Sequence, residues 1–424
     1  MILILSFIFF MLLGVPLFGV IGIATIFSIF GMPIPLEFVP QNLYIGMDQF
    51  PLIATLGFVM AGFLMEPAGI TDEIIDVARK AVGNVTGGLG IVTVLACMIF
   101  AALSGSGPAT TAAIGSIMIP GMLRAGYRKD DAAGVSATGG TLGILIPPSN
   151  PMILFGVVAN TSVAGLFMAG VVPGATLTTL MCITCYIIAK KRGYKPSGEK
   201  FSIVKLMRAV WKGKWALGTP AIILGGIYSG VFTPTESAEV GVLYTLFVGI
   251  VIYRKLSIKN ITSALVRTAS FAGSSTILVG VSMAFSRLMT LYHIPQTVGQ
   301  FLASISTNPT ITLLLIAFFI FLCGFVADTL AMVVVLAPVF LPITNSLGID
   351  PMQLGVLFVV CCETGFLTPP FGGNLFVVMK LVDVKLEDVS LKVIPFLIVL
   401  WIEIFIVAAF PQITLWLPRV LMGS

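Results

Sequence analysis

Charged residues are scarce in this chain. Only 10% of its 424 residues are charged, 58% are hydrophobic, and the mean hydropathy is +1.09. This composition cannot cover a globular surface with polar groups, so a soluble fold is excluded. Apolar spans of about 20 residues recur along the chain, whereas outer-membrane barrels show short segments of alternating polarity. The sequence therefore predicts an all-α polytopic membrane protein.

The residues that several chemistries require are also missing. The chain has a single histidine, His293, and no G-x-x-x-x-G-K-[ST] phosphate loop, which argues against a nucleotide-driven pump. Cys182 and Cys185 lie in an apolar stretch without a neighbouring histidine or carboxylate, so we expect inert, buried thiols. We expect no cofactor and no nucleic-acid partner.

Basic residues are concentrated in one segment. Nine of the 23 Lys and Arg residues fall between Lys190 and Lys214, which the positive-inside rule assigns to the cytoplasm. Residues 191–215 are therefore predicted to be a cytoplasmic linker. This linker separates a first half, residues 1–190, from a second half, residues 216–424.

The remaining charges predict the orientation of two further segments. Basic residues flank residues 88–122, so both ends of that segment are expected in the cytoplasm. Between residues 288 and 349 the only charged residue is Asp328, so both ends of that region are expected outside. Residues 1–30 lack a basic n-region and a cleavage site, and we expect them to remain in the membrane as one tilted helix or two short ones.

The two halves share landmark residues at a constant offset of 222 residues. Because the predicted orientations are opposite, the pattern indicates an inverted repeat, as in secondary transporters whose sites lie where interrupted helices meet. Each repeat is expected to hold a re-entrant hairpin, at about 88–122 and about 310–346, and a broken helix, at about 133–158 and about 353–379. The landmark pairs are Pro120 with Pro342, Gly143 with Gly365, and Pro147-Pro148 with Pro369-Pro370.

Proline and glycine interrupt both broken helices. Proline frees the carbonyl four residues earlier, and free carbonyls beside hydroxyl and amide oxygens suit a hard cation such as sodium. Only two carboxylates, Asp328 and Glu363, lie near these interrupted segments, whereas calcium sites usually recruit several, which argues against calcium. We expect two pseudo-symmetric sodium sites. The first comprises Ser104, Ser106, Gly143, Pro147, Ser149 and Asn150, and the second Gly324, Asp328, Gly365, Thr368 and Asn374.

The half-helices that begin near Ala109 and Leu330 are expected to point their positive dipole ends at one midplane cavity, which favours an anionic substrate group. A membrane carboxylate such as Asp328 is presumptively functional, although it can also be protonated or cap the following half-helix. Small and hydroxylated residues can instead serve close helix packing alone. The candidate substrate-binding residues are Ser106, Thr110, Thr111, Asn150, Thr329 and Asn374.

Three other polar residues have structural explanations beside functional ones. Glu236 lies at a helix start, where capping explains it as well as binding does. Arg287 could meet a substrate carboxylate, but a side chain that reaches toward the membrane interface is favoured. His293 is expected in an outer loop. A serine protease would need it beside Ser106, which is expected near midplane.

These features resemble the large membrane subunit of tripartite ATP-independent periplasmic (TRAP) transporters, in the wider ion-transporter superfamily. The motifs that carry the resemblance are "SGSGPATTAAIGSIMIPGM", "GILIPPSNPMILFG" and "GVFTPTESAEVG". The resemblance implies a sodium-driven elevator in the bacterial inner membrane, with a moving domain built from both hairpins and both broken helices and a scaffold built from the other helices. It also implies a separate four-helix membrane (Q) subunit and a periplasmic binding protein as partners.

The resemblance further implies an organic acid substrate, with sialic acid (N-acetylneuraminate) favoured. A C4-dicarboxylate TRAP system and a one-component sodium/dicarboxylate symporter are the alternatives, and an intramembrane serine protease is a remote one. Phe371-Gly372 replaces Ser149-Asn150 in the second repeat, so its sodium site should depend more on backbone carbonyls. The family's sodium-site pattern falls on Ser104, Ser149, Asn150, Gly324, Gly365 and Thr368.

Overall fold

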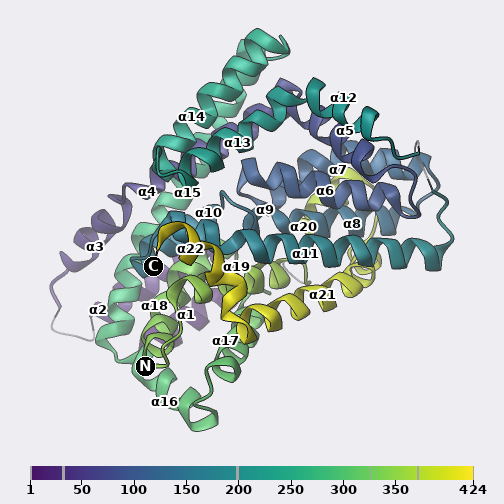
Figure 1. Ribbon diagram of the computed structural model, residues 1–424. Coiled ribbons are helices and arrows are strands. Elements are labelled where there is room, and N and C mark those ends of the chain that lie inside the picture. Colours follow the sequence, from purple (N-terminus) through teal and green to yellow (C-terminus); the bar gives the residue numbers. More distant parts are fainter. Residues whose placement is uncertain (1, 31–33, 197–199, 326, 370–371, 424) are drawn as a thin grey trace.

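Figure 1 shows a computed structural model of the chain, which describes residues 2–30, 34–196, 200–325, 327–369 and 372–423. Within these ranges all regular elements are helices. Seven of the described helices are long and apolar enough to cross a membrane. The predicted all-α polytopic architecture is therefore confirmed.

The helices of the first half include two short N-terminal ones rather than one long tilted helix. The bounds are α1 (Ile2–Leu12), α2 (Leu17–Ile29), α3 (Phe38–Met47), α4 (Pro51–Ala68), α5 (Ile70–Val82), α6 (Gly88–Ser104), α7 (Gly107–Arg124), α8 (Lys129–Gly140), α9 (Leu142–Leu145), α10 (Asn150–Ala159) and α11 (Val163–Arg192). Helices α6 and α7 pack together around a two-residue break, and α8, α9 and α10 follow as one interrupted helix.

The rest of the chain, whose α12 lies within the linker predicted for residues 191–215, repeats this order. Its bounds are α12 (Ile203–Lys212), α13 (Lys214–Tyr228), α14 (Pro234–Phe247) with a π-helical turn (Val248–Ile252), α15 (Ile258–Leu291), α16 (Ile294–Ile305), α17 (Pro309–Cys323), α18 (Thr329–Ser346), α19 (Pro351–Phe366), α20 (Gly373–Leu381), α21 (Leu386–Ala409) and α22 (Pro411–Met422). Helices α17 and α18 correspond to α6 and α7, and α19 and α20 correspond to the interrupted helix. We call α6–α7 the first hairpin and α17–α18 the second hairpin.

Side-chain caps fix several helix starts. Asp350 accepts a hydrogen bond from the amide of Met352 at 2.8 Å at the start of α19. Thr233 and Glu236 form a reciprocal capping box at the start of α14, so the structure gives Glu236 the capping function. His293 takes a left-handed φ of 55° just before α16, and Arg287 is exposed on α15. The structure therefore shows capping for Glu236, whereas the outer position of His293 and the interface position of Arg287 stay predictions.

The two repeats exchange the second halves of their interrupted helices. Helix α10, from the first repeat, packs against α18 of the second hairpin. Helix α20, from the second repeat, packs against α7 of the first hairpin and against α8. Figure 1 shows this second contact, with the yellow-green α20 lying among the blue helices α6, α7 and α8. Each repeat therefore supplies a helix to the packing of the other.

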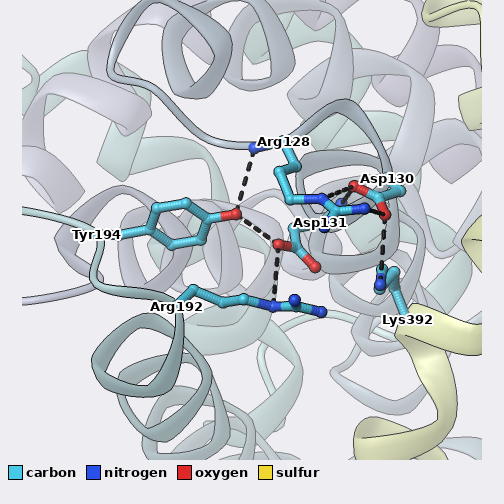
Figure 2. A network of polar contacts seen from close by, with 6 residues as sticks. All are labelled: Arg128, Asp130, Asp131, Arg192, Tyr194 and Lys392. Atoms are coloured by element: carbon cyan, nitrogen blue, oxygen red, sulfur yellow. Dashed lines mark hydrogen bonds and ion pairs between the residues drawn. The ribbon is translucent and has the colours of Figure 1, made fainter.

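A polar network ties the start of α8, just after the first hairpin, to two other helices (Figure 2). Arg128, between α7 and α8, makes a bidentate ion pair with Asp130 at 3.1 and 2.9 Å. Lys392 of α21 reaches the same carboxylate at 3.3 Å. Tyr194, just after α11, donates a hydrogen bond to the buried Asp131. The network thereby joins the start of α8 to α21 and to the end of α11.

We expect Tyr194→Phe to destabilise this junction. Burial raises the pKa of Tyr194 to about 12, so its hydroxyl stays protonated and donates to Asp131 at physiological pH. Removing this donor should lower the free energy of unfolding by about 0.5–1.5 kcal/mol, the net value of a typical hydrogen bond, because the buried Asp131 loses Tyr194 but keeps its ion pair with Arg192 at 3.5 Å. Thermal unfolding of the purified chain measures the change. Tyr186→Phe on the exposed side of α11 is the matched control, and equal midpoints for the two variants would contradict the prediction.

Candidate functional site

A cavity of about 340 Å³ lies where the two hairpin breaks approach α15. One side of the cavity is formed by the hairpin breaks and the interrupted helices, which contribute Ser106, Asn150 and Thr329. Two carboxyl groups, those of Asp328 and Glu363, also line the cavity. Helices α15 and α2 close the other side, with Phe271, Ser274, Ser275, Leu278 and Phe18. Among the described residues that line the cavity there is no lysine, arginine or histidine, so any positive potential from them comes from backbone dipoles or bound cations.

The tip of the first hairpin depends on a glycine. Gly105 ends α6 with a φ of +58°, a conformation that residues with a Cβ rarely adopt. A Cβ at this position would also lie 3.0 Å from the carbonyl oxygen of Pro148. The Gly105 carbonyl accepts a hydrogen bond from the amide of Asn150 at 3.3 Å. The interrupted helix therefore lies directly against the hairpin tip.

The residues of the first expected sodium site converge around this tip. The hydroxyls of Ser104 and Thr110 are 2.7 Å apart, and a Cβ on Gly143 would lie 2.6 Å from the carbonyl oxygen of Ser106. Ser149 caps α10 through a 3.3 Å hydrogen bond from the amide of Met152. Pro147 forms a cis peptide bond with Pro148.

Asn150 completes this group with two free polar atoms. Both side-chain polar atoms are buried and have no hydrogen-bond partner in the described part of the chain. The residue itself is 3% exposed. Burying an amide without hydrogen-bond partners costs free energy, so this side chain is suited to bind a ligand that supplies the missing contacts.

The residues of the second expected sodium site converge only in part. The backbones of Gly324 and Gly365 touch, because a Cβ on Gly365 would lie 2.7 Å from the Cα of Gly324. Asp328 accepts hydrogen bonds from the amides of Leu330 and Ala331 at 2.8 and 3.1 Å. This is the capping geometry considered for Asp328 from the sequence.

Two other members of the second site make contacts elsewhere. The Thr368 hydroxyl, just beyond the end of α19, donates to the carbonyl oxygen of Thr364 in that helix at 2.9 Å. The Asn374 amide nitrogen donates to Glu363 at 3.2 Å. Gly107, at the tip of the first hairpin, packs against this pair. The replacement noted at Phe371, like Pro370 of the repeated proline pair, lies outside the described residues.

The substrate candidates divide into two groups. Ser106, Asn150 and Thr329 line the cavity, whereas Thr110, Thr111 and Asn374 lie behind it and are 0% exposed. The hydroxyl of Thr111 is buried without a partner among the described residues. The α7 half-helix starts at the cavity with Ser106 as its N-cap, and this side chain makes no capping hydrogen bond. The amides of Gly107 and Ala109 are therefore available to an anionic group, whereas Pro108 between them has no N–H.

Sequence reasoning missed two contributors to this cavity. Glu363 was noticed only as a nearby carboxylate, yet its side chain lines the cavity. The α15 residues Phe271, Ser274 and Ser275 were not predicted at all. The run of small and hydroxylated residues "SFAGSS" inside a long apolar helix was the available signal, since such residues permit close approach to a neighbouring surface.

A polytopic helical protein whose paired interrupted helices enclose a central cavity has the arrangement of a secondary transporter. Residues 4–413 match the family described as "Tripartite ATP-independent periplasmic transporter, DctM component", and the chain belongs to this family. It is therefore a transporter permease rather than an enzyme, and a multi-pass protein of the bacterial inner membrane. The protease alternative is excluded.

Named relatives have several different substrates. The isethionate TRAP permease DctMQ of Oleidesulfovibrio alaskensis is 36% identical over 96% of this chain, which spans 64% of that relative's length. The sialic acid large permease SiaM of Vibrio cholerae is 36% identical over 97% of this chain and 96% of its own. The C4-dicarboxylate large permease DctM of Pseudomonas aeruginosa is 38% identical over 88% of this chain and 87% of its own.

Two solved structures share the fold at low sequence identity. The Alcanivorax borkumensis YdaH transporter has a TM-score of 0.67 and 15% identity, and the match covers 97% of this chain and 98% of that one. Neisseria gonorrhoeae MtrF has a TM-score of 0.58 and 14% identity, and the match covers 90% of this chain and 83% of that one. At these identities the likeness extends to the fold alone.

Proposed function

We propose that the chain performs sodium-coupled secondary uptake of an organic acid. The main support is the cavity between the two hairpin breaks, where free amides and hydroxyls lie beside two carboxyl groups. Its volume of about 340 Å³ falls within the range of small-molecule pockets, roughly 300–1,000 Å³. The half-helix of α7 suits the anionic group of the substrate, and bound sodium ions supply the positive charge that the lining lacks.

Transport proceeds in this proposal by an elevator motion. The hairpins and interrupted helices interlock, because α10 packs on α18 and α20 packs on α7. Such interlocked elements are suited to move as one body. The cavity lies at the border between this body and helices α2 and α15, which supports a substrate site that is covered on one side by the scaffold.

The partners in this proposal are a small four-helix membrane subunit and a soluble periplasmic binding protein. The family's tripartite description and the fused DctMQ relative support both. Sialic acid is the proposed cargo, as for the relative SiaM. Isethionate, C4-dicarboxylates and 2,3-diketo-L-gulonate are the cargoes named for other relatives, so they form the comparison panel.

The test is uptake of labelled acids into proteoliposomes that hold this chain with its small subunit. We expect sialic acid to accumulate only with an inward sodium gradient and the periplasmic binding protein present. Sodium-dependent uptake without the binding protein would indicate a one-component symporter instead. Accumulation of another acid of the panel would replace sialic acid as cargo, and equilibration without a sodium requirement would contradict the coupling.

A further inference from the structure

Helix α12 has three faces of different character. The buried Ala209 and the half-buried Leu206 and Val210 lie on the side that packs against α5 and α13. Figure 1 shows α12 beside α5 at one edge of the molecule. The other two faces of α12 point away from the rest of the chain and are exposed.

One exposed face of α12 is apolar. Ile203, Met207 and Trp211 are spaced four residues apart, so they lie along one side of the helix. Val204 lies beside them, and all four side chains are between 60% and 71% exposed. A continuous exposed surface of large apolar side chains marks contact with a membrane or with a partner.

The adjoining face of α12 is basic. Lys205, Arg208 and Lys212 follow one another at spacings of three and four residues, and the helix contains no acidic residue. The ammonium of Lys212 is 3.1 Å from Glu73 of α5, and the lysine side chain is still 67% exposed. Just beyond the helix, the ammonium of Lys214 lies 4.1 Å from the centre of the Trp211 ring. Positive charge therefore borders the apolar face.

The length of α12 excludes a membrane span. Its ten residues measure about 15 Å, whereas the hydrocarbon core of a bilayer is roughly 30 Å thick. It follows α11, a membrane helix of 30 residues, within the linker that the positive-inside rule assigns to the cytoplasm. A short helix with one apolar face, one basic face and a tryptophan is suited to lie in the plane of the membrane surface.

We propose that α12 lies in the membrane surface and binds anionic phospholipid there. Met207 and Trp211 enter the boundary between headgroups and acyl chains, while Lys205 and Arg208 pair with headgroups that carry a net negative charge. Charge complementarity selects this occupant, because the cytoplasmic leaflet presents an anionic layer directly above an apolar one. Neither sodium coupling nor the identity of the cargo enters into this binding.

The experiment uses Trp211 as a reporter in the full-length chain, reconstituted into vesicles that contain phosphatidylglycerol and phosphatidylcholine. The parent variant carries Trp215→Phe, Trp401→Phe and Trp416→Phe, which replace the other three of the four tryptophans. Bromine atoms on acyl chains quench tryptophan fluorescence only at close contact. At one fixed lipid composition, either the phosphatidylglycerol or the phosphatidylcholine is brominated, so the two quenching values report which lipid lies against Trp211.

We expect phosphatidylglycerol to bind at this position with at least about fivefold higher affinity than phosphatidylcholine. A fivefold ratio corresponds to about 1 kcal/mol, the contribution of one Lys or Arg at an anionic surface. Lys205→Gln with Arg208→Gln should bring the ratio close to one while Trp211 stays quenched, because the apolar face is unchanged. High salt should lower the ratio of the parent variant as well.

Lys190→Gln with Lys191→Gln is the matched control. These two exposed lysines lie in the last turn of α11, so the control removes the same charge from a neighbouring helix. We expect this variant to keep the affinity ratio of the parent variant. An equal loss of preference in both double variants would show that the net charge of the linker, and not the basic face of α12, attracts the lipid.

Three further results would overturn the proposal. Equal quenching by the two lipids in the parent variant would contradict recognition of anionic lipid. An unquenched Trp211 would contradict the place of α12 in the membrane surface. Quenching that disappears when a tryptophan-free small membrane subunit is added would assign the apolar face to a protein contact instead.

A second measurement keeps all native tryptophans and carries the test if the parent variant does not fold. Phosphatidylglycerol added to the purified chain in detergent should raise the midpoint of thermal unfolding more than phosphatidylcholine does, because a ligand of the folded state stabilises it. Lys205→Gln with Arg208→Gln should remove most of this difference. A wild-type chain that the two lipids stabilise equally would contradict the proposal.

Discussion

Replacing Gly365 with alanine is expected to destabilise the protein by about 1–3 kcal/mol or more, since overpacking a filled interior forces the backbone to move. A Cβ at this position would lie 2.7 Å from the Cα and 3.1 Å from the carbonyl carbon of Gly324. Both obstructing atoms belong to the backbone, so no side-chain rotation can relieve the clash. The midpoint of thermal unfolding and the yield of monodisperse protein measure the effect.

Gly273→Ala is the matched control for this substitution. Gly273 lies within α15, and no atom is within 4 Å of the position its Cβ would take. Alanine should therefore stabilise the helix here by about 0.5–1 kcal/mol. A Gly365→Ala variant that is as stable as Gly273→Ala would mean that α17 and α19 do not make this close contact.

Two substitutions of Asp328 should separate its capping function from its charge. Asp328→Ala removes the acceptor for the amides of Leu330 and Ala331, and should cost about 0.5–2 kcal/mol of stability. Asp328→Asn keeps an equally good cap, so its unfolding midpoint in potassium should match wild type. If the carboxylate also contributes to the second expected sodium site, Asp328→Asn should raise the sodium concentration for half-maximal uptake at least about tenfold, the loss expected for a charge-assisted ligand.

Uptake and thermal unfolding must be measured on the same Asp328→Asn preparation. Unchanged stability with a weakened sodium response would support the ligand function. A wild-type sodium response in Asp328→Asn would show that Asp328 only caps α18, and the second site would then have to rely on backbone carbonyls and Thr368.

The helical architecture could be predicted because the hydrophobic effect leaves few options for so apolar a chain. The interruptions could be located because glycine and proline act locally on the backbone, as at Gly105 and Pro147. The internal offset of 222 residues also anticipated that α17–α20 correspond to the helices α6–α10. These features follow from residues that are close together in the sequence or from a repeat within it, so they can be recognised in one sequence.

The assignment of residues to separate sites was harder, because it depends on packing between distant segments. Asn374 was grouped with its own repeat, yet it lies against Gly107 of the other hairpin. Ser274 and Ser275 line the cavity from α15; the run "SFAGSS" signals that another surface approaches closely there, but it does not say which segment lies opposite. Thr110 and Thr111 are fully buried behind the hairpin tip, and their expected contact with substrate stays a prediction.

The exchange of α10 and α20 between the repeats has a consequence for how such a protein can arise. Helix α20 packs on the first hairpin and α10 on the second, so neither half of the chain holds all the helices that its hairpin contacts. A half-length protein with this architecture would complete its packing only by pairing with a second copy. With the predicted opposite orientations, the two copies would have to insert into the membrane in opposite directions. In the present chain, the basic linker joins the two halves and holds them in these opposite orientations within one polypeptide.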